Sequence, residues 1–140
     1  MVKGTKKNLY SLIKPFFDIN FLFLIITLIL FGLLILGGRA KTDDYKKLND
    51  VISKKVDQVI LLGESKNIML KQITAVNNIA IVDSIENAVI KAKDFATKLC
   101  DESKIPVNII LSPACSSFDM FKSYEERGQL FKKYALNQYR

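Results

Sequence analysis

The 140-residue sequence contains no histidine and only two cysteines. The lack of histidine excludes a Ser-His-Asp triad, a histidine general base and any zinc site with histidine ligands. Cys100 and Cys115 are too few for a disulfide framework or a four-thiolate metal site, and they do not form a CxxC motif. Two such thiols are typical of a reduced, cytosolic setting. The sequence also lacks a GxxxxGK[ST] phosphate loop and a GxGxxG motif after a strand.

The positive charge is unevenly distributed. The net charge is +7, and residues 1–40 contain five basic side chains and one acidic side chain. Residues 41–140 are nearly balanced, with 16 basic and 13 acidic side chains. No basic stripe with interleaved aromatic residues accompanies this charge, so we expect no nucleic-acid partner.

An uncharged, mostly apolar run extends from Ile19 to Gly38, and four lysines precede it. This length is enough for a transmembrane helix, so residues 1–32 are predicted to form a basic segment with an apolar helix, and residues 16–36 are a candidate membrane contact. The alternative is a buried strand at Leu33–Leu36. That strand would leave only Ile19–Gly32 for the helix, about 21 Å against a hydrocarbon core of about 30 Å. The two interpretations therefore compete for the same residues.

Beyond this run, short apolar stretches alternate with amphipathic ones. The apolar stretches predict buried parallel strands at Leu33–Leu36, Gln58–Leu62, Ile79–Val82 and Val107–Leu111. Helical periodicity predicts helices over residues 45–56, 66–73, 84–99 and 124–137, with Asp83 and Ser123 as N-caps, each followed three residues later by glutamate. The order predicts an α/β domain over residues 33–140, with a Rossmann-like parallel sheet of about four strands and flanking helices.

Ligands of such sheets bind at the carboxyl ends of the strands, where three stretches are candidates. The first, residues 37–43, joins two glycines to Lys41, whose ammonium suits a carboxylate or phosphate; an ordinary turn with a solvated lysine is the alternative. The second, residues 63–65, is interpreted as purely structural. The third, residues 111–119, offers hydroxyls and amides for an anion, although Ser117 and Asp119 are equally explained as helix caps. Cys115 is interpreted as a small buried thiol. We identify no catalytic or metal-binding residue.

Two of these stretches resemble a known family. Residues 111–128, LSPACSSFDMFKSYEERG, resemble the signature near the C-terminus of the UDP-N-acetylmuramoyl-L-alanine:D-glutamate ligases, which belong to the Mur ligases of peptidoglycan synthesis. Residues 36–45, LGGRAKTDDY, resemble the glycine-glycine turn and lysine of the same family. Residues 59–64 and 82–84 match in the same order. The resemblance covers residues 33–137 and corresponds to the third, C-terminal domain of these enzymes.

The resemblance implies a role in holding the amino-acid substrate. Lys41 and Ser117 would contact the carboxylates of D-glutamate, and Tyr124 would line the same pocket, where many relatives have phenylalanine. In the family, ATP and Mg²⁺ serve a central domain that this sequence does not contain. We therefore expect a cytoplasmic ligase domain that binds no cofactor, is inactive alone and has D-glutamate and the missing ligase domains as partners. The alternative is a membrane-anchored interaction protein or a remnant without catalysis, with association at the inner membrane.

Overall fold

The computed structural model describes residues 32–40, 44–103 and 107–138. Strands and helices alternate along them as predicted. The strands are β1 (Gly32–Gly37), β2 (Val56–Leu62), β3 (Ile79–Ile81) and β4 (Asn108–Ala114). The helices are the short 3₁₀ helix η2 (Lys46–Leu48) and the α-helices α3 (Asn49–Lys55), α4 (Lys66–Gln72), α5 (Ile85–Ser103) and α6 (Tyr124–Asn137).

The four strands form one parallel sheet in the order β3-β2-β1-β4, which confirms the predicted α/β fold. The first strand is central because β1 pairs with β2 on one side and with β4 on the other. The predicted strand at Leu33–Leu36 is therefore confirmed. β4 runs three residues further than predicted, through Ser112 and Pro113. A proline is tolerated there because β4 lies at the edge of the sheet, where one side of the strand needs no backbone donor.

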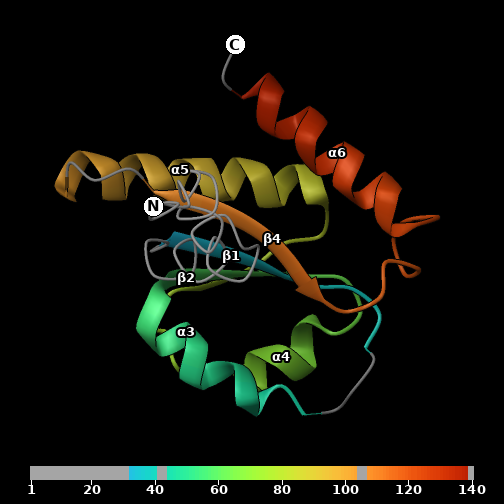
Figure 1. The fold of residues 1–140 in the computed structure, drawn as a ribbon, viewed down its shortest axis with the longest axis horizontal. Helices are drawn as coiled ribbons and strands as arrows, with labels where there is room; N and C mark the ends of the chain where they lie inside the picture. The colour runs from blue at the N-terminus through green and yellow to red at the C-terminus, as the bar shows by residue number, and fades with distance from the viewer. Residues whose placement is uncertain (1–31, 41–43, 104–106, 139–140) are drawn as a thin grey trace, which may run out of the picture. The chain divides into compact units, whose positions relative to one another are not determined.

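Helices cover both faces of the sheet, as Figure 1 shows, with α3 and α4 on one side and α5 and α6 on the other. Alternating side chains of β1 and β2 supply the two apolar layers. Leu36, Val59 and Leu61 pack toward α3 and α4. The α5 and α6 layer contains Leu33, Ile35, Ile60, Leu62, Ile85, Ala88 and Ala92. Burial on both faces explains why these strands are almost continuously apolar in sequence.

The two predicted helix caps have different outcomes. Ser123 caps α6, because its hydroxyl accepts a hydrogen bond from the Glu126 amide at 3.2 Å. The Glu126 carboxylate accepts from the Lys122 amide at 2.6 Å, one residue earlier than a standard capping box requires. The prediction for Asp83 is wrong. The Ser84 hydroxyl accepts from the Asn87 amide at 3.1 Å, while the Asp83 carboxylate pairs with the Lys66 ammonium at 2.6 Å.

The candidate membrane contact falls only partly within the described residues. Residues 32–36 belong to β1 and so do not extend a helix, whereas residues 16–31 lie outside the described part of the chain. In the described ranges, no helix combines the length and the apolar character that crossing a bilayer requires. The division of the chain at residue 32 stays a prediction.

Candidate functional site at the carboxyl edge of the sheet

The turns that follow β1, β2 and β4 are joined by backbone hydrogen bonds. The Gly38 amide donates to the Leu62 carbonyl at 3.1 Å, and the Ser65 amide donates to the Gly38 carbonyl at 2.9 Å. Arg39 and Ser116 exchange two backbone hydrogen bonds of 2.9 and 3.1 Å. The carboxyl edge of the sheet is therefore a single connected unit, in which the turn at residues 63–65 takes part.

The paired glycines are needed for contact between these turns. Gly37 has a φ of +128°, and a Cβ at this position would lie 1.8 Å from the Leu62 carbonyl oxygen. A Cβ on Gly38 would lie 2.2 Å from the Ser116 carbonyl oxygen. These separations are far below van der Waals contact, so a larger residue would force the strand ends apart. The sequence analysis predicted that the paired glycines let the backbone approach a ligand closely. In this structure, they let the neighbouring turns approach one another closely.

Asp119 links the turn after β4 to the turn after β2. Its Oδ2 accepts a hydrogen bond from the Glu64 amide at 2.9 Å. Gly63 approaches so closely that a Cβ there would lie 2.4 Å from the same oxygen. Residues 63–65 thus take part in joining the turns, in keeping with their interpretation as structural, and the contact with Asp119 was not predicted. No sequence pattern pointed to this contact, because Asp119 and Glu64 are far apart in the chain and meet only through the sheet.

The prediction that Cys115 is a small buried thiol is confirmed. Its Sγ lies 3.2 Å from the Tyr45 hydroxyl and 3.2 Å from the Ser65 hydroxyl, and both residues are buried. The Cys115 thiol therefore packs between the Tyr45 and Ser65 hydroxyls and contributes to the structure of the carboxyl edge.

Ser117 occupies the position that the sequence favoured, at the carboxyl edge, and only 3% of it is exposed. Its carbonyl accepts from the Met120 and Phe121 amides at 3.2 and 2.9 Å, so residues 117–121 form a tight turn. Phe118, the next residue, is 64% exposed. The turn therefore holds Ser117 inward and presents an aromatic side chain to solvent.

Tyr124 stands in a different environment from Ser117. It is the first residue of α6, and 70% of it is exposed. Its side chain is therefore not enclosed in a pocket by the described residues. A hydrogen bond with Glu125, together with the charge of that residue, raises the pKa of Tyr124. The hydrogen bond from Ser123 is the main cause of the lowered pKa of Glu125.

Arg127, on the next turn of α6, is bound to the site. Its Nη1 donates to the Cys115 carbonyl at 3.3 Å. Burial lowers the pKa of Arg127, and the charge of Asp119 opposes that shift. This contact fixes the start of α6 against the turn that contains Ser117.

Lys41 lies outside the described residues. Arg39, two residues earlier, is described. Its backbone pairs with Ser116, and its guanidinium pairs with the Glu64 carboxylate at 3.2 Å. The chain that leads to Lys41 therefore starts beside the stretch that holds Ser117.

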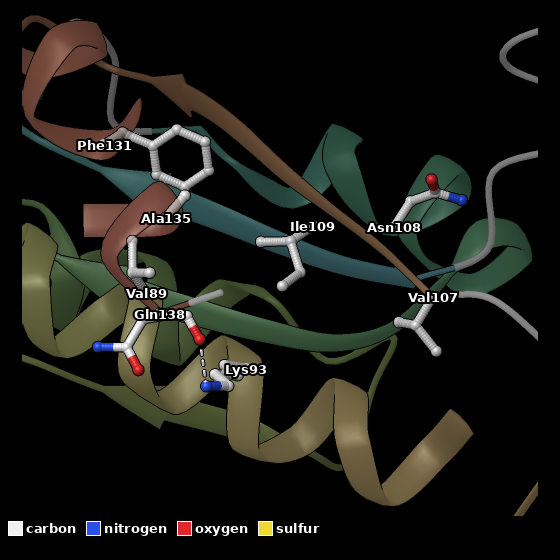
Figure 2. A pocket seen from close by; sticks show the side chains of 8 residues that line it. All are labelled: Val89, Lys93, Val107, Asn108, Ile109, Phe131, Ala135 and Gln138. Carbon is white, nitrogen blue, oxygen red and sulfur yellow. Dashed lines mark hydrogen bonds between the residues drawn. The ribbon is translucent and has the colours of Figure 1, made fainter. Parts of the chain in front are cut away.

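A separate hollow lies between α5, α6 and the beginning of β4 (Figure 2). It has a volume of about 250 Å³ and is lined by Val89, Lys93, Val107, Asn108, Ile109, Phe131, Ala135 and Gln138. The Lys93 ammonium donates to the Gln138 carbonyl, so this charge is already engaged. Neither Ser117 nor Tyr124 lines the hollow, which is mostly apolar.

The described ranges contain no group of three or more histidine, cysteine, aspartate or glutamate side chains placed to hold a metal ion. The sequence also contains no phosphate loop.

Comparison with known proteins identifies UDP-N-acetylmuramoylalanine–D-glutamate ligases among the relatives of this chain. The sequence is 40% identical over 100 residues to a UDP-N-acetylmuramoylalanine–D-glutamate ligase of Chlorobium limicola, a match that covers 71% of this chain and 20% of the relative. The ligase of Caldicellulosiruptor saccharolyticus is 39% identical over 104 residues, and that of Coxiella burnetii is 41% identical over 99 residues. Each of these two matches covers 21% of the relative, and 73% and 71% of this chain. Most of this chain is homologous to one part of these ligases. No family model matches the sequence.

The chain spans about a fifth of the length of the D-glutamate ligases that it matches. In the structure, the stretch that resembles the ligase signature forms one continuous feature of the carboxyl edge. It runs from β4 through the buried Cys115 and Ser117 to Asp119, and then into the first turns of α6. The signature therefore coincides with the part of the fold in which the turns are bound together most closely.

Proposed function

We propose that this chain contains the D-glutamate-binding, C-terminal domain of a peptidoglycan-precursor ligase. The observation that carries the proposal is the buried Ser117 at the carboxyl edge, inside the stretch that resembles the ligase signature. The proposal is supported by identities of about 40% to proteins named as D-glutamate ligases. The location agrees with the rule that open α/β sheets bind ligands beyond the carboxyl ends of their strands.

The proposed chemistry is recognition of a dianionic amino acid. The Ser117 hydroxyl donates to one carboxylate, and the Lys41 ammonium forms a charge-assisted hydrogen bond with a carboxylate. Tyr124 provides an exposed aromatic surface beside them. In this proposal, the domain contributes to catalysis through proximity and orientation. It positions the amine of D-glutamate for attack on an activated carboxylate.

We further propose that the chain alone does not form the amide bond. Activation of the carboxylate by ATP needs a nucleotide site, and the sequence lacks the phosphate-loop motif GxxxxGK[ST]. The remaining ligase domains are the proposed partners, and the cytoplasm is the proposed location. An assay of phosphate release with ATP, UDP-N-acetylmuramoyl-L-alanine and D-glutamate tests this point, and turnover above background would contradict it.

Titration of the ¹⁵N-labelled full chain with D-glutamate, followed by NMR, tests the binding proposal. We expect D-glutamate to shift the amide signals of residues near Ser117, and L-glutamate to bind at least several-fold more weakly. Ser117→Ala and Lys41→Ala should each raise the Kd about tenfold, which corresponds to about 1.4 kcal/mol. Ser53→Ala is a matched control, because that exposed hydroxyl lies on α3 and donates to the Asp50 carbonyl.

Tyr124 offers a second matched pair. Tyr124→Phe keeps the aromatic ring that many relatives carry and should bind like the original chain, whereas Tyr124→Ala should weaken binding about threefold, since one exposed ring contact is worth less than 1 kcal/mol. The absence of any D-glutamate binding, or equal affinity for the D and L forms, would refute the binding proposal.

A further inference from the structure

The Asp119 carboxylate is divided between two environments. Oδ2 accepts from the Glu64 amide at 2.9 Å, whereas Oδ1 is buried and has no hydrogen-bond partner among the described residues. A buried oxygen without a partner is rare in folded proteins and calls for an explanation. Such a carboxylate is retained when its position in the fold is more important than hydrogen bonding of both of its oxygens.

Arg127, on α6, lies close enough to Asp119 for their charges to interact. Arg127 is partly buried, its Nη1 binds the Cys115 carbonyl at 3.3 Å, and the Asp119 charge acts on its guanidinium. Asp119 is therefore bound to the turn after β2 and interacts electrostatically with Arg127 of α6.

Ser117 lies between the two anchor points. Arg127 holds the carbonyl of Cys115, two residues before Ser117, and Asp119, two residues after it, holds the amide of Glu64. The Ser117 carbonyl itself closes the turn over residues 117–121. The backbone of the Ser117 turn is consequently held on both sides by these two contacts.

We infer that Asp119 and Arg127 are positioning residues that hold Ser117 in place for the carboxylate of an amino-acid ligand. The inference rests on the proposed function for the identity of the ligand. Neither residue touches that ligand in this assignment: both act through the backbone of the Ser117 turn.

The test uses the full chain and compares Asp119→Ala with Asp119→Asn. We expect Asp119→Ala to raise the Kd for D-glutamate about tenfold, measured by NMR on the folded protein. Asp119→Asn should stay within threefold of the original Kd, because the amide oxygen of asparagine can still accept from the Glu64 N–H. Asp57→Ala is the control, since Asp57 is exposed at the opposite end of β2 and should leave the Kd unchanged.

Two outcomes of this titration would overturn the inference. One is an Asp119→Ala variant whose Kd stays within twofold of the original value; the other is an Asp119→Asn variant as weak as Asp119→Ala. A purely structural role would lower the folded fraction without changing the affinity of the folded molecules. Should Asp119→Ala not fold, Arg127→Met tests the same turn from α6, with an expected threefold rise in Kd and an unchanged Kd as the contradicting result.

Failure of the proposed function would be visible separately. If the original chain does not bind D-glutamate, the ligand assignment is wrong, and amide hydrogen exchange decides the positioning role. We expect the Met120 and Phe121 amides, which bind the Ser117 carbonyl, to exchange about tenfold faster in Asp119→Ala than in Asp57→Ala. Equal exchange rates would overturn the inference.

Discussion

The two ends of the parallel sheet are built in different ways. At the carboxyl edge, the turns after three strands share backbone hydrogen bonds, and Asp119 and Cys115 connect them further. At the amino end of β4, apolar side chains of α5, α6 and the strand surround a hollow of about 250 Å³. The carboxyl edge is thus constrained by directional contacts and the amino end by loose apolar packing. Placement of a ligand to within fractions of an ångström is easier to achieve with the former.

The buried polar groups of the two ends have different surroundings, although each end has one buried oxygen without a hydrogen-bond partner among the described residues, Asp119 Oδ1 and Gln58 Oε1. At the carboxyl edge, the buried Ser65 hydroxyl has the Cys115 thiol as a partner. Near the amino end, the Oε1 atom of Gln58 on β2 is buried and accepts no hydrogen bond from the described residues. Gln58 points to the same face as Ile60 and Leu62 because side chains alternate along a strand. Substitutions at the two ends should therefore differ in sign as well as in size.

Gly37→Ala should have the largest effect. Its Cβ would lie 1.8 Å from the Leu62 carbonyl oxygen at a φ of +128°, so both sterics and backbone strain oppose alanine. We expect a loss of about 3 kcal/mol or more in the free energy of unfolding, measured by urea denaturation. Gly128→Ala is the control, because a Cβ there meets nothing within 4 Å on α6 and alanine should stabilise the helix by about 0.5 kcal/mol. Similar effects of the two changes would contradict the tight packing of the edge.

Cys115→Ala should have the next largest effect. The substitution removes the thiol that lies 3.2 Å from both the Tyr45 and the Ser65 hydroxyls, and it leaves a small cavity. We expect a loss of about 2 kcal/mol in thermal or urea denaturation. Cys100→Ala should change stability by less than about 0.5 kcal/mol, since Cys100 is exposed. A Cys115→Ala variant as stable as Cys100→Ala would show that the thiol is not a structural contact.

Gln58→Met should act in the opposite direction. Methionine keeps the volume of the side chain and removes the buried oxygen that lacks a partner, so we expect a gain of about 1 kcal/mol in the free energy of unfolding. Gln129→Met, on the exposed side of α6, should stay within about 0.5 kcal/mol of the original chain. Destabilisation by Gln58→Met would mean that the amide of Gln58 has a role in the fold.

Glu64→Gln should have the smallest effect. Its carboxylate pairs with the Arg39 guanidinium at 3.2 Å, but both side chains are more than half exposed. We expect a loss of about 0.5 kcal/mol or less at low salt, and a smaller one at 1 M NaCl. The Glu64 amide keeps its bond to Asp119 in this variant. A loss above 1 kcal/mol would indicate that the carboxyl edge depends on this surface ion pair.

The sequence was sufficient to predict most of the fold. Runs such as residues 58–62 are short, apolar and rich in branched side chains because a parallel strand is buried on both faces. The bounds of α6 were predicted as observed because Ser123 and Glu126 mark its start. The strand at Leu33–Leu36 was correct although it lies within a longer apolar run. The predicted cap of α5 was wrong by one residue, because Asp83 and Ser84 are both residue types that favour N-caps. In the structure, the Asp83 carboxylate pairs with the Lys66 ammonium, and Ser84 caps the helix.

The candidate site was only partly predictable. Strand ends located the stretch with Ser117, and the resemblance to ligases assigned roles to Lys41, Ser117 and Tyr124. The roles of Gly63 and Asp119 were missed because they depend on the distance between two turns, which local patterns do not encode. Asp119 looks like a helix cap in sequence, and only the sheet order brings it to the Glu64 amide.

The central place of β1 has a consequence for the order in which the domain folds. β1 pairs with β2, the next strand in the chain, and β3 pairs with the other side of β2. Its other neighbour, β4, lies far downstream: the Tyr45–Cys115 contact beside this pairing joins residues 70 positions apart. Closing so long a loop is entropically costly and slow compared with local pairing. Cys115, Ser117 and Asp119 all follow β4, so the connected carboxyl edge is complete only when the last strand is added.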